Sequence, residues 1–433
     1  MSPTLVGILG IAILVLLLFS RMPVGFVMAL VGVVGFGFLV SSNAAMNMMV
    51  KDLFQVFGSY NLTVIPLFIL MGQIAFHAGI SSRLFNVAYK FIGQWPGGLA
   101  IATIGACTGF AAICGSTNAT AATMAAVTLP EMKKYHYKDS LATGVVAAGG
   151  SLGILIPPSV IFIVYGLMTE QSIGKLFMAG ILPGLMLSCL FSMAVMIWTH
   201  LKPEIAPRGP NFTLKEKFVS LSGLIETLLL FMMVMGGLFF GIFTPTEAGA
   251  VGAFGTLLIA IARRKIDFRG FIQSLVETAR ISCMILMVVA GATIFGHFLA
   301  ITRIPFDIAN WVSGFQLPPF AIMGIIILIY LIGGCFIDAL ALIMLTVPIF
   351  YPVIGSLGFD PIWFGVIIVL ITQIGVITPP VGINVYVVSG VAKDVPLHVI
   401  FKGIFPLFFA LLLGTFILVL FPQIAIFLPG LMR

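Results

Sequence analysis

Long apolar runs separated by short polar loops set the pattern of this chain. Runs near 20 residues recur from one end to the other, and about 20 apolar residues let a helix cross the hydrocarbon core of a bilayer. The pattern predicts an all-α polytopic membrane protein with about 10 transmembrane helices. We expect these spans at 3–20, 23–42, 57–80, 140–168, 174–200, 218–243, 245–262, 281–300, 361–390 and 400–421.

Two segments do not follow this pattern. Residues 97–134 and 317–355 are each too long for one crossing, and polar and glycine residues interrupt them in the middle. The interruptions read Gly115-Ser-Thr-Asn118 and Gly333-Gly-Cys-Phe-Ile-Asp338. Irregular polar backbone occurs at membrane depth only where protein buries it or where it lines a watery cavity. We therefore predict two re-entrant helical hairpins whose tips line a cavity.

Two proline pairs interrupt two of the predicted spans. Pro157-Pro158 lies in span 140–168 and Pro379-Pro380 lies in span 361–390. A proline inside a helix removes a backbone donor and disrupts the helix, so we expect broken helices with free carbonyls at 153–156 and 375–378. The order of spans, hairpin and broken helix recurs in both halves. This predicts repeats at 1–205 and 206–433, inverted because each would contain an odd number of crossings.

Composition and charge further restrict the class of protein. Hydrophobic residues make up 61% of the 433 and charged residues 8%, which excludes a soluble fold. The net charge of +7 comes from basic residues in short loops, where membrane orientation explains them better than nucleic-acid binding does. The basic loops fall on one side if the amino terminus is outside. We expect an inner-membrane protein with both termini on the outer, periplasmic side.

The hairpin tips and helix breaks have the chemistry of an ion and anion site. A helix that starts at a tip presents free N–H groups and its positive dipole end, which suits an anion. Carbonyl and hydroxyl oxygens with little net charge suit Na⁺ or a similar ion, and we expect two or more such ions, one at each tip and break. The expected cation ligands are Ser116, Asn118, Gly153, Ile156, Gly333, Gly334, Asp338, Gly375 and Thr378. The expected substrate contacts are Ser116, Thr117, Asn118, Thr378 and Arg303.

Two of these residues leave alternatives open. A lone carboxylate within the membrane is costly, so Asp338 is expected to bind the second cation, to take part in proton coupling or to make a structural hydrogen bond. Arg303 follows a span, where it is expected either to meet an incoming carboxylate or to anchor the helix at the interface.

Two hairpins that face one midplane cavity indicate an elevator-type ion transporter. The hairpins and broken helices would move as a block against the remaining spans. Short amphipathic segments at 82–94 and 304–316 are expected to lie along the membrane interface, as arms between fixed and moving parts or as plain loop helices.

Four motifs together resemble the large membrane subunit of the tripartite ATP-independent periplasmic (TRAP) transporters. They are Gly115-Ser-Thr-Asn-Ala-Thr120, Gly153-Ile-Leu-Ile-Pro-Pro-Ser159, Gly241-Ile-Phe-Thr-Pro-Thr-Glu-Ala-Gly249 and Thr378-Pro-Pro-Val-Gly-Ile-Asn384. The resemblance extends over essentially the whole chain.

The resemblance implies a bacterial secondary transporter that is driven by a sodium gradient. An enzyme is not expected, because the sequence shows no catalytic pair such as two facing acids and no metal cluster. The resemblance further implies an organic-acid substrate, such as a dicarboxylate or sialic acid, delivered by a periplasmic binding protein, and a separate small four-helix membrane subunit. The alternative is a stand-alone sodium- or proton-coupled symporter for divalent anions, which would share hairpins and breaks but need no soluble receptor.

Overall fold

Every regular element of the described chain is helical. The computed structural model describes residues 2–18, 20, 22–314 and 318–432, and no strand occurs within these ranges. Arg21, Arg433 and residues 315–317, where the second predicted arm meets the second hairpin, lie outside them. The prediction of an all-α fold is confirmed.

The helices before residue 206 include the first hairpin and the first broken helix. They are α1 (Pro3–Leu18), α2 (Val24–Leu39), α3 (Ser42–Phe57), α4 (Val64–His77), α5 (Ile80–Ile92), α6 (Gly98–Cys114), α7 (Thr117–Lys134), α8 (Asp139–Ser151), α9 (Val160–Thr169) and α10 (Ile173–Leu201), with 3-10 turns at Tyr60–Thr63, Leu152–Ile154 and Pro203–Ile205.

The helices after residue 206 include a second helix-turn-helix and a second interruption. They are α11 (Leu214–Ser220), α12 (Ser222–Phe239), α13 (Pro245–Ala262), α14 (Phe268–Thr302), α15 (Ile304–Gly314), α16 (Pro319–Gly334), α17 (Ala339–Ser356), α18 (Pro361–Ile377), α19 (Ile383–Val391), α20 (Leu397–Leu420) and α21 (Gln423–Gly430).

Seven described helical segments are long and apolar enough to cross a membrane, judged by length and composition. One is α17, the second arm of the second helix-turn-helix, while its first arm α16 is among the shorter apolar helices. These segments identify a multi-pass membrane protein. The number of crossings stays a prediction.

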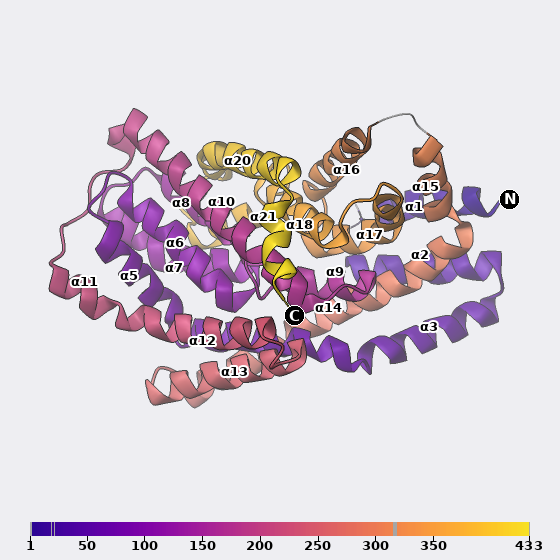
Figure 1. Ribbon diagram of the computed structural model, residues 1–433, viewed down its shortest axis with the longest axis horizontal. Coiled ribbons are helices and arrows are strands. Elements are labelled where there is room, and N and C mark those ends of the chain that lie inside the picture. Colours follow the sequence, from indigo (N-terminus) through magenta and orange to yellow (C-terminus); the bar gives the residue numbers. More distant parts are fainter. Residues whose placement is uncertain (1, 19, 21, 315–317, 433) are drawn as a thin grey trace.

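The long helix α14 organises one side of the molecule. It packs along α2 and α3 (Figure 1) and along α4, which packs in turn on α13. The contact with α2 is backbone to backbone, because a side chain at Gly291 would collide with the main chain of Gly25. Small residues permit this close approach between membrane helices.

Two features of this side differ from the prediction. The span expected at 281–300 is longer, because α14 begins at Phe268 behind an Asp267 cap that accepts from Gly270 N at 2.8 Å. The helix α3 was not predicted, because its polar residues broke the apolar pattern. Its Asp52 is buried and lies 2.8 Å from the His297 ring on α14, so the helix contact provides the partner for that carboxylate.

A cluster of three charged side chains joins α5, the predicted amphipathic segment, to α12 and α13. The arm expected at 82–94 is α5, and Arg83 near its start lies 2.5 Å from Glu226 on α12. Arg263, just after α13, also pairs with Glu226. The buried carboxylate therefore ties α5, α12 and the end of α13 together.

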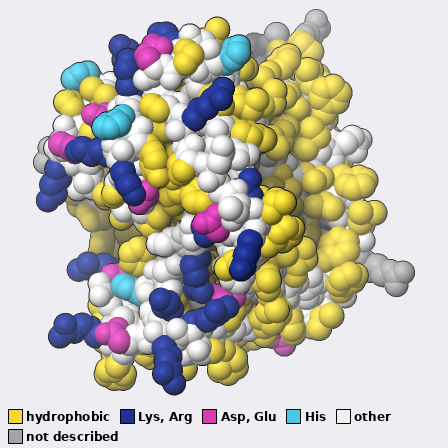
Figure 2. Space-filling model, turned by 90° about the vertical axis from the view of Figure 1, so that its left-hand side faces the viewer, with side chains coloured by type: hydrophobic (Ala, Val, Ile, Leu, Met, Phe, Trp, Pro, Cys, Tyr) yellow, Lys and Arg dark blue, Asp and Glu magenta, His cyan; other side chains and the backbone are white. Residues whose placement is uncertain are grey.

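Basic side chains gather at one end of the molecule. Figure 2 shows many Lys and Arg side chains on the end that carries α11 in Figure 1. The amino terminus lies at the opposite end and the carboxyl terminus near the middle of that view (Figure 1). The asymmetry agrees with loop charges that orient the chain in a membrane.

Candidate functional site

The first hairpin tip is a tight turn held by its own polar groups. Gly115 adopts a left-handed conformation, with φ +63°, that ends α6. Ser116 caps α7, where its hydroxyl accepts from Ala119 N at 3.4 Å, and its carbonyl accepts from the Thr120 hydroxyl at 2.8 Å. The tip thus places the amino terminus of α7, the positive end of its dipole, directly after the end of α6.

The first helix break lies directly against this tip. The chain leaves α8 at Ser151 and resumes as α9 at Val160, with Ser159 as the cap. A Cβ atom added to Gly153 would lie 2.6 Å from the Ser116 carbonyl oxygen, so these two backbones are in contact. Gly115 approaches the Pro158 carbonyl just as closely. The predicted pairing of the first tip with the first break is present.

The second tip and break also lie together. A Cβ at Gly334 would lie 3.2 Å from Gly375 Cα, and a side chain at Gly375 would overlap the Gly334 backbone. The Thr378 hydroxyl lies 3.3 Å from the Cys335 sulfur and donates to the Ile374 carbonyl at 2.9 Å. Backbone approach at glycines, rather than polar side chains, builds this second junction.

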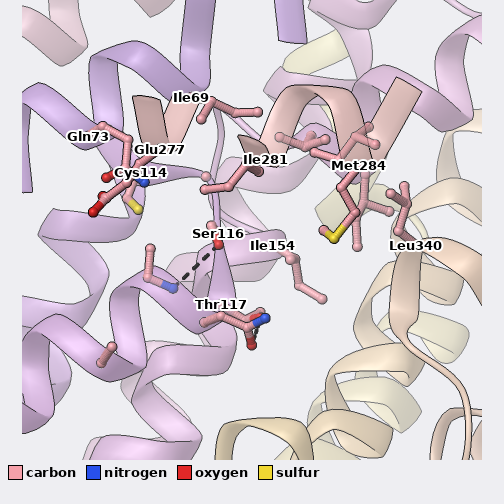
Figure 3. Close-up of a pocket in the computed structure, with 18 of the residues that line it drawn as sticks. Ile69, Gln73, Cys114, Ser116, Thr117, Ile154, Glu277, Ile281, Met284 and Leu340 are labelled. Carbon is pink, nitrogen blue, oxygen red and sulfur yellow. Dashed lines mark hydrogen bonds between the residues drawn. The ribbon is translucent and has the colours of Figure 1, made fainter. Parts of the chain in front are cut away.

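A cavity of about 520 Å³ lies between the two hairpin tips and α4 and α14. Ser116, Thr117 and Asn118 line it from the first tip, and Asp338 and Leu340 line it from the second. Ser116, Thr117 and Leu340 can be seen in Figure 3. The starts of three helices, α7, α9 and α17, open into it. Apolar side chains of α14, such as Ile281 and Met284, form much of the remaining wall.

Asp338 has a structural partner as well as access to the cavity. It caps α17, where its carboxylate accepts from Leu340 N at 3.1 Å. The hydrogen-bonding alternative for this residue is therefore present in the fold. Its place in the cavity lining leaves a cation-binding role open.

The other predicted residues lie outside the cavity lining. Thr378, Gly333, Gly334 and Gly375 form the second junction beside it. Arg303 follows α14, where its guanidinium lies over the Phe306 ring at 5.4 Å and lines a separate hollow. The structure thus brings Ser116, Thr117, Asn118 and Asp338 together and does not bring Arg303 to them.

Ile156 and Gly153, both in the first break, make different contacts. The Gly153 backbone contacts Ser116, whereas the Ile156 side chain packs against Gly184 of α10. Within the part of the chain that the structure describes, no group of three His, Cys, Asp or Glu residues could hold a metal. The predicted cation ligands are instead backbone carbonyls, hydroxyl and amide oxygens and the single carboxylate of Asp338.

Sequence reasoning missed three polar residues that line the cavity, and one of them is Thr123 on α7. Gln73 lies in α4 and Glu277 lies in α14, and Figure 3 shows them side by side near Cys114. Glu277 accepts from Gln273 at 3.0 Å, and its other oxygen lies 3.7 Å from His77 Nε2. A glutamine inside an apolar span is the signal that could have identified this part of the wall.

The cavity is acidic in its side chains. Glu277 and Asp338 contribute carboxylates, and no Lys, Arg or His lies among the described residues of the lining. Positive potential comes from helix amino termini, which attract anions without carrying a formal charge. This arrangement can hold a carboxylate at the helix starts and a cation near the acids.

Comparison with known proteins identifies the family. The sequence matches the family described as "Tripartite ATP-independent periplasmic transporter, DctM component" over residues 11–424. It is 36% identical over 393 residues to the C4-dicarboxylate TRAP transporter large permease protein DctM of Pseudomonas aeruginosa, covering 90% of this chain and 91% of that protein. It is 34% identical over 417 residues to the sialic acid TRAP transporter large permease protein SiaM of Vibrio cholerae, covering 96% of each.

Solved structures support the same fold at low sequence identity. The Alcanivorax borkumensis YdaH transporter aligns with a TM-score of 0.60 and 14% identity, covering 85% of this chain and 87% of its own. MtrF of Neisseria gonorrhoeae aligns with a TM-score of 0.56 and 14% identity, covering 87% and 83%. The family match and the relatives confirm the resemblance found in the motifs: the chain belongs to the DctM component family, the large membrane permeases of the TRAP transporters.

Proposed function

We propose that this permease imports an organic acid into the cell, coupled to a sodium gradient. The observation that carries the proposal is the cavity into which Ser116–Asn118 and Asp338 face from two separate hairpins. The carboxylate of the acid binds at the amino terminus of α7, where N–H groups and the helix dipole favour an anion. Related permeases include C4-dicarboxylate and sialic acid transporters, which supports an organic acid as the substrate class.

The cations bind at the two junctions between tips and breaks. Ser116, Asn118, Gly153 and Ile156 serve the first Na⁺, and Gly333, Gly334, Asp338, Gly375 and Thr378 serve the second. Close backbone contact at Gly153 and at Gly375 supports this assignment, since it brings carbonyl-bearing segments together. Coupling requires that Na⁺ and the acid favour each other's binding, because a ligand that binds two states equally shifts neither.

Transport follows an elevator movement between two inverted repeats, 1–205 and 206–433. The hairpins and broken helices move together, and α1–α4 with α12–α14 form the support. The repeated order of helix-turn-helix and interrupted helix in both halves favours this mechanism. Arg303 contributes only if the movement brings it to the incoming acid.

The permease works in the bacterial inner membrane with two partners, and both chain termini are periplasmic. A small four-helix membrane subunit completes the support, and a periplasmic binding protein delivers the acid. The family name, tripartite and periplasmic, supports such an assembly.

Reconstitution in liposomes tests the proposal. The chain and its small subunit are inserted together, and uptake of labelled succinate and sialic acid is measured with and without their binding proteins. We expect uptake of one acid that requires both an inward Na⁺ gradient and its binding protein. Uptake that persists after a sodium ionophore collapses the gradient would overturn sodium coupling. Equal uptake of free acid would favour the stand-alone symporter.

A further inference from the structure

The cavity has a second polar region, which carries a carboxylate where the hairpin tip presents a helix amino terminus. Gln73 is 8% exposed and, within the described part of the chain, its amide has no hydrogen-bond partner. It faces the cavity beside Glu277 (Figure 3). A buried polar group without a partner costs free energy, so an amide left free in a cavity wall is suited to bind a ligand.

Glu277 gives this region a negative charge on the supporting side. Its Oε1 is held by Gln273 at 3.0 Å, which leaves its Oε2 facing His77 at 3.7 Å, beyond hydrogen-bond distance. An ionised carboxylate only accepts hydrogen bonds. A ligand group beside Glu277 must therefore donate, because a second carboxylate there would face a like charge.

Apolar side chains also line the cavity near this region. Ile69 and Ile281 are among them, and Cys114 at the end of α6 lies near Gln73 and Glu277 (Figure 3). A bound acid that spans the cavity meets the helix amino terminus at Ser116–Asn118 and the carboxylate of Glu277, with the Gln73 amide beside it. The two regions differ in what they can bind.

We infer that Gln73 and Glu277 select organic acids that carry a hydrogen-bond donor, a hydroxyl or an ammonium group, at the end away from the bound carboxylate. The inference rests on the proposed function and narrows its substrate class. A plain dicarboxylate places its second charge beside Glu277 and is disfavoured. The two residues determine specificity from the supporting side, while Ser116–Asn118 hold the carboxylate.

A panel of six-carbon acids tests this inference in the purified complex of the chain with its small subunit. Gluconate carries hydroxyls, 6-aminohexanoate an ammonium, adipate a second carboxylate and hexanoate a methyl at the far end. Binding in the presence of Na⁺ is measured by calorimetry. We expect a donor-bearing acid to bind on the order of tenfold more tightly than adipate, as a hydrogen bond to a charged group allows. Comparison of gluconate with 6-aminohexanoate shows which donor is preferred.

Three variants separate specificity from folding. Glu277→Gln keeps the side-chain size and should abolish the preference over adipate, and Gln73→Met should weaken donor-acid binding. Glu204→Gln removes the same charge from an exposed site outside the cavity and should change nothing. Equal binding of all four acids, no binding of any, or a preference unchanged in Glu277→Gln would overturn the inference. So would a loss of Na⁺ affinity alone in that variant.

Failure of the inference and failure of the proposed function are distinguishable. Sodium-driven uptake by the unaltered complex, supplied with binding protein, reports on the proposed function without reference to the panel. If that uptake is present while the panel shows no donor preference, the selectivity assigned to Gln73 and Glu277 is wrong and the transport proposal stands.

Discussion

The two hairpins differ in how far the rest of the protein encloses them. The first arm of the first hairpin, α6, is buried along most of its length and packs on α5, α7, α8 and α10. The first arm of the second, α16, packs mainly on α18 and exposes a row of large apolar side chains, Phe320, Ile325, Leu328 and Ile332. In a membrane protein such a row can face lipid, so the second hairpin has fewer protein neighbours to hold it.

The two hairpin tips also differ in the contacts that stabilise them. The first tip uses side chains, with Ser116 capping α7 and Thr120 bonded to the turn. The second uses close backbone contact at Gly334 and Gly375. Both tips approach their breaks through glycine backbone, but hydroxyl groups cap the turn at the first tip and a carboxylate caps the helix at the second. Substitutions should therefore act differently at the two tips.

The largest effect is expected at the second junction. Gly375→Ala places a methyl group on the Gly334 backbone, and overpacking of this kind costs about 1–3 kcal/mol. We expect a lower Tm in detergent and loss of Na⁺-driven uptake. Gly324→Ala in α16 is the matched control, because nothing lies within 4 Å of its added methyl group. Normal uptake by Gly375→Ala would show that the close approach is dispensable.

Asp338→Asn tests the acid of the second tip. Asparagine also caps helices well, so α17 should keep its start and the protein should insert normally. Loss of the negative charge should weaken Na⁺ activation of uptake by on the order of tenfold. The measurement is the Na⁺ concentration that gives half-maximal uptake. An unchanged sodium dependence would leave Asp338 with its capping role alone.

Ser116→Ala tests the first tip. Loss of the cap hydroxyl should cost about 1 kcal/mol of stability and should also weaken binding of the acid, seen as a higher KM for uptake. Ser41→Ala is the control, because Ser41 caps α3 through Ala44 N at 3.2 Å and lies outside the cavity lining. If both variants alter uptake equally, Ser116 acts only as a cap.

The smallest effect is expected where the first hairpin meets the loop after α19. Lys133 of α7 pairs with Asp394 at 2.5 Å on the surface, and the lysine lowers the pKa of this carboxyl. The ion pair stabilises the fold at neutral pH, where the Asp394 carboxyl is ionised. This stabilisation is lost as pH falls below about 4 and through the lowered pKa, because protonation removes the negative charge. Exposed pairs contribute little, so Asp394→Asn should barely change the Tm at pH 7. A large loss at neutral pH would show that this contact holds the hairpin in place.

Much of the fold could be predicted because the membrane makes polar interruptions conspicuous. Both helix-turn-helix segments and both proline breaks lie where the sequence predicted them. The helix α3 was missed because Asp52 and its polar neighbours look like a loop until His297 of α14 is placed beside them. A partner distant in sequence cannot be read from local pattern.

The site was predicted at its tips and missed at its far wall. Ser116–Asn118 and Asp338 interrupt apolar runs, so they stood out. Glu277 lies near Arg280 and resembles the charged end of a helix, and only the packing of α14 against α4 turns it toward the cavity. Which helices share a cavity depends on tertiary packing, which helical periodicity does not determine.

The carboxylate of Glu226 determines which part of α5, the amphipathic helix before the first hairpin, is held in place. By joining Arg83 to α12 and Arg263, it anchors the start of α5 to the supporting helices. Displacement of the first hairpin relative to those helices must then be absorbed beyond that anchor. Gly93 and Gly97, the latter with φ +71°, lie between the end of α5 and the start of α6. In the proposed elevator movement, the first hairpin would therefore pivot in this glycine-containing connection rather than at the anchored start of α5.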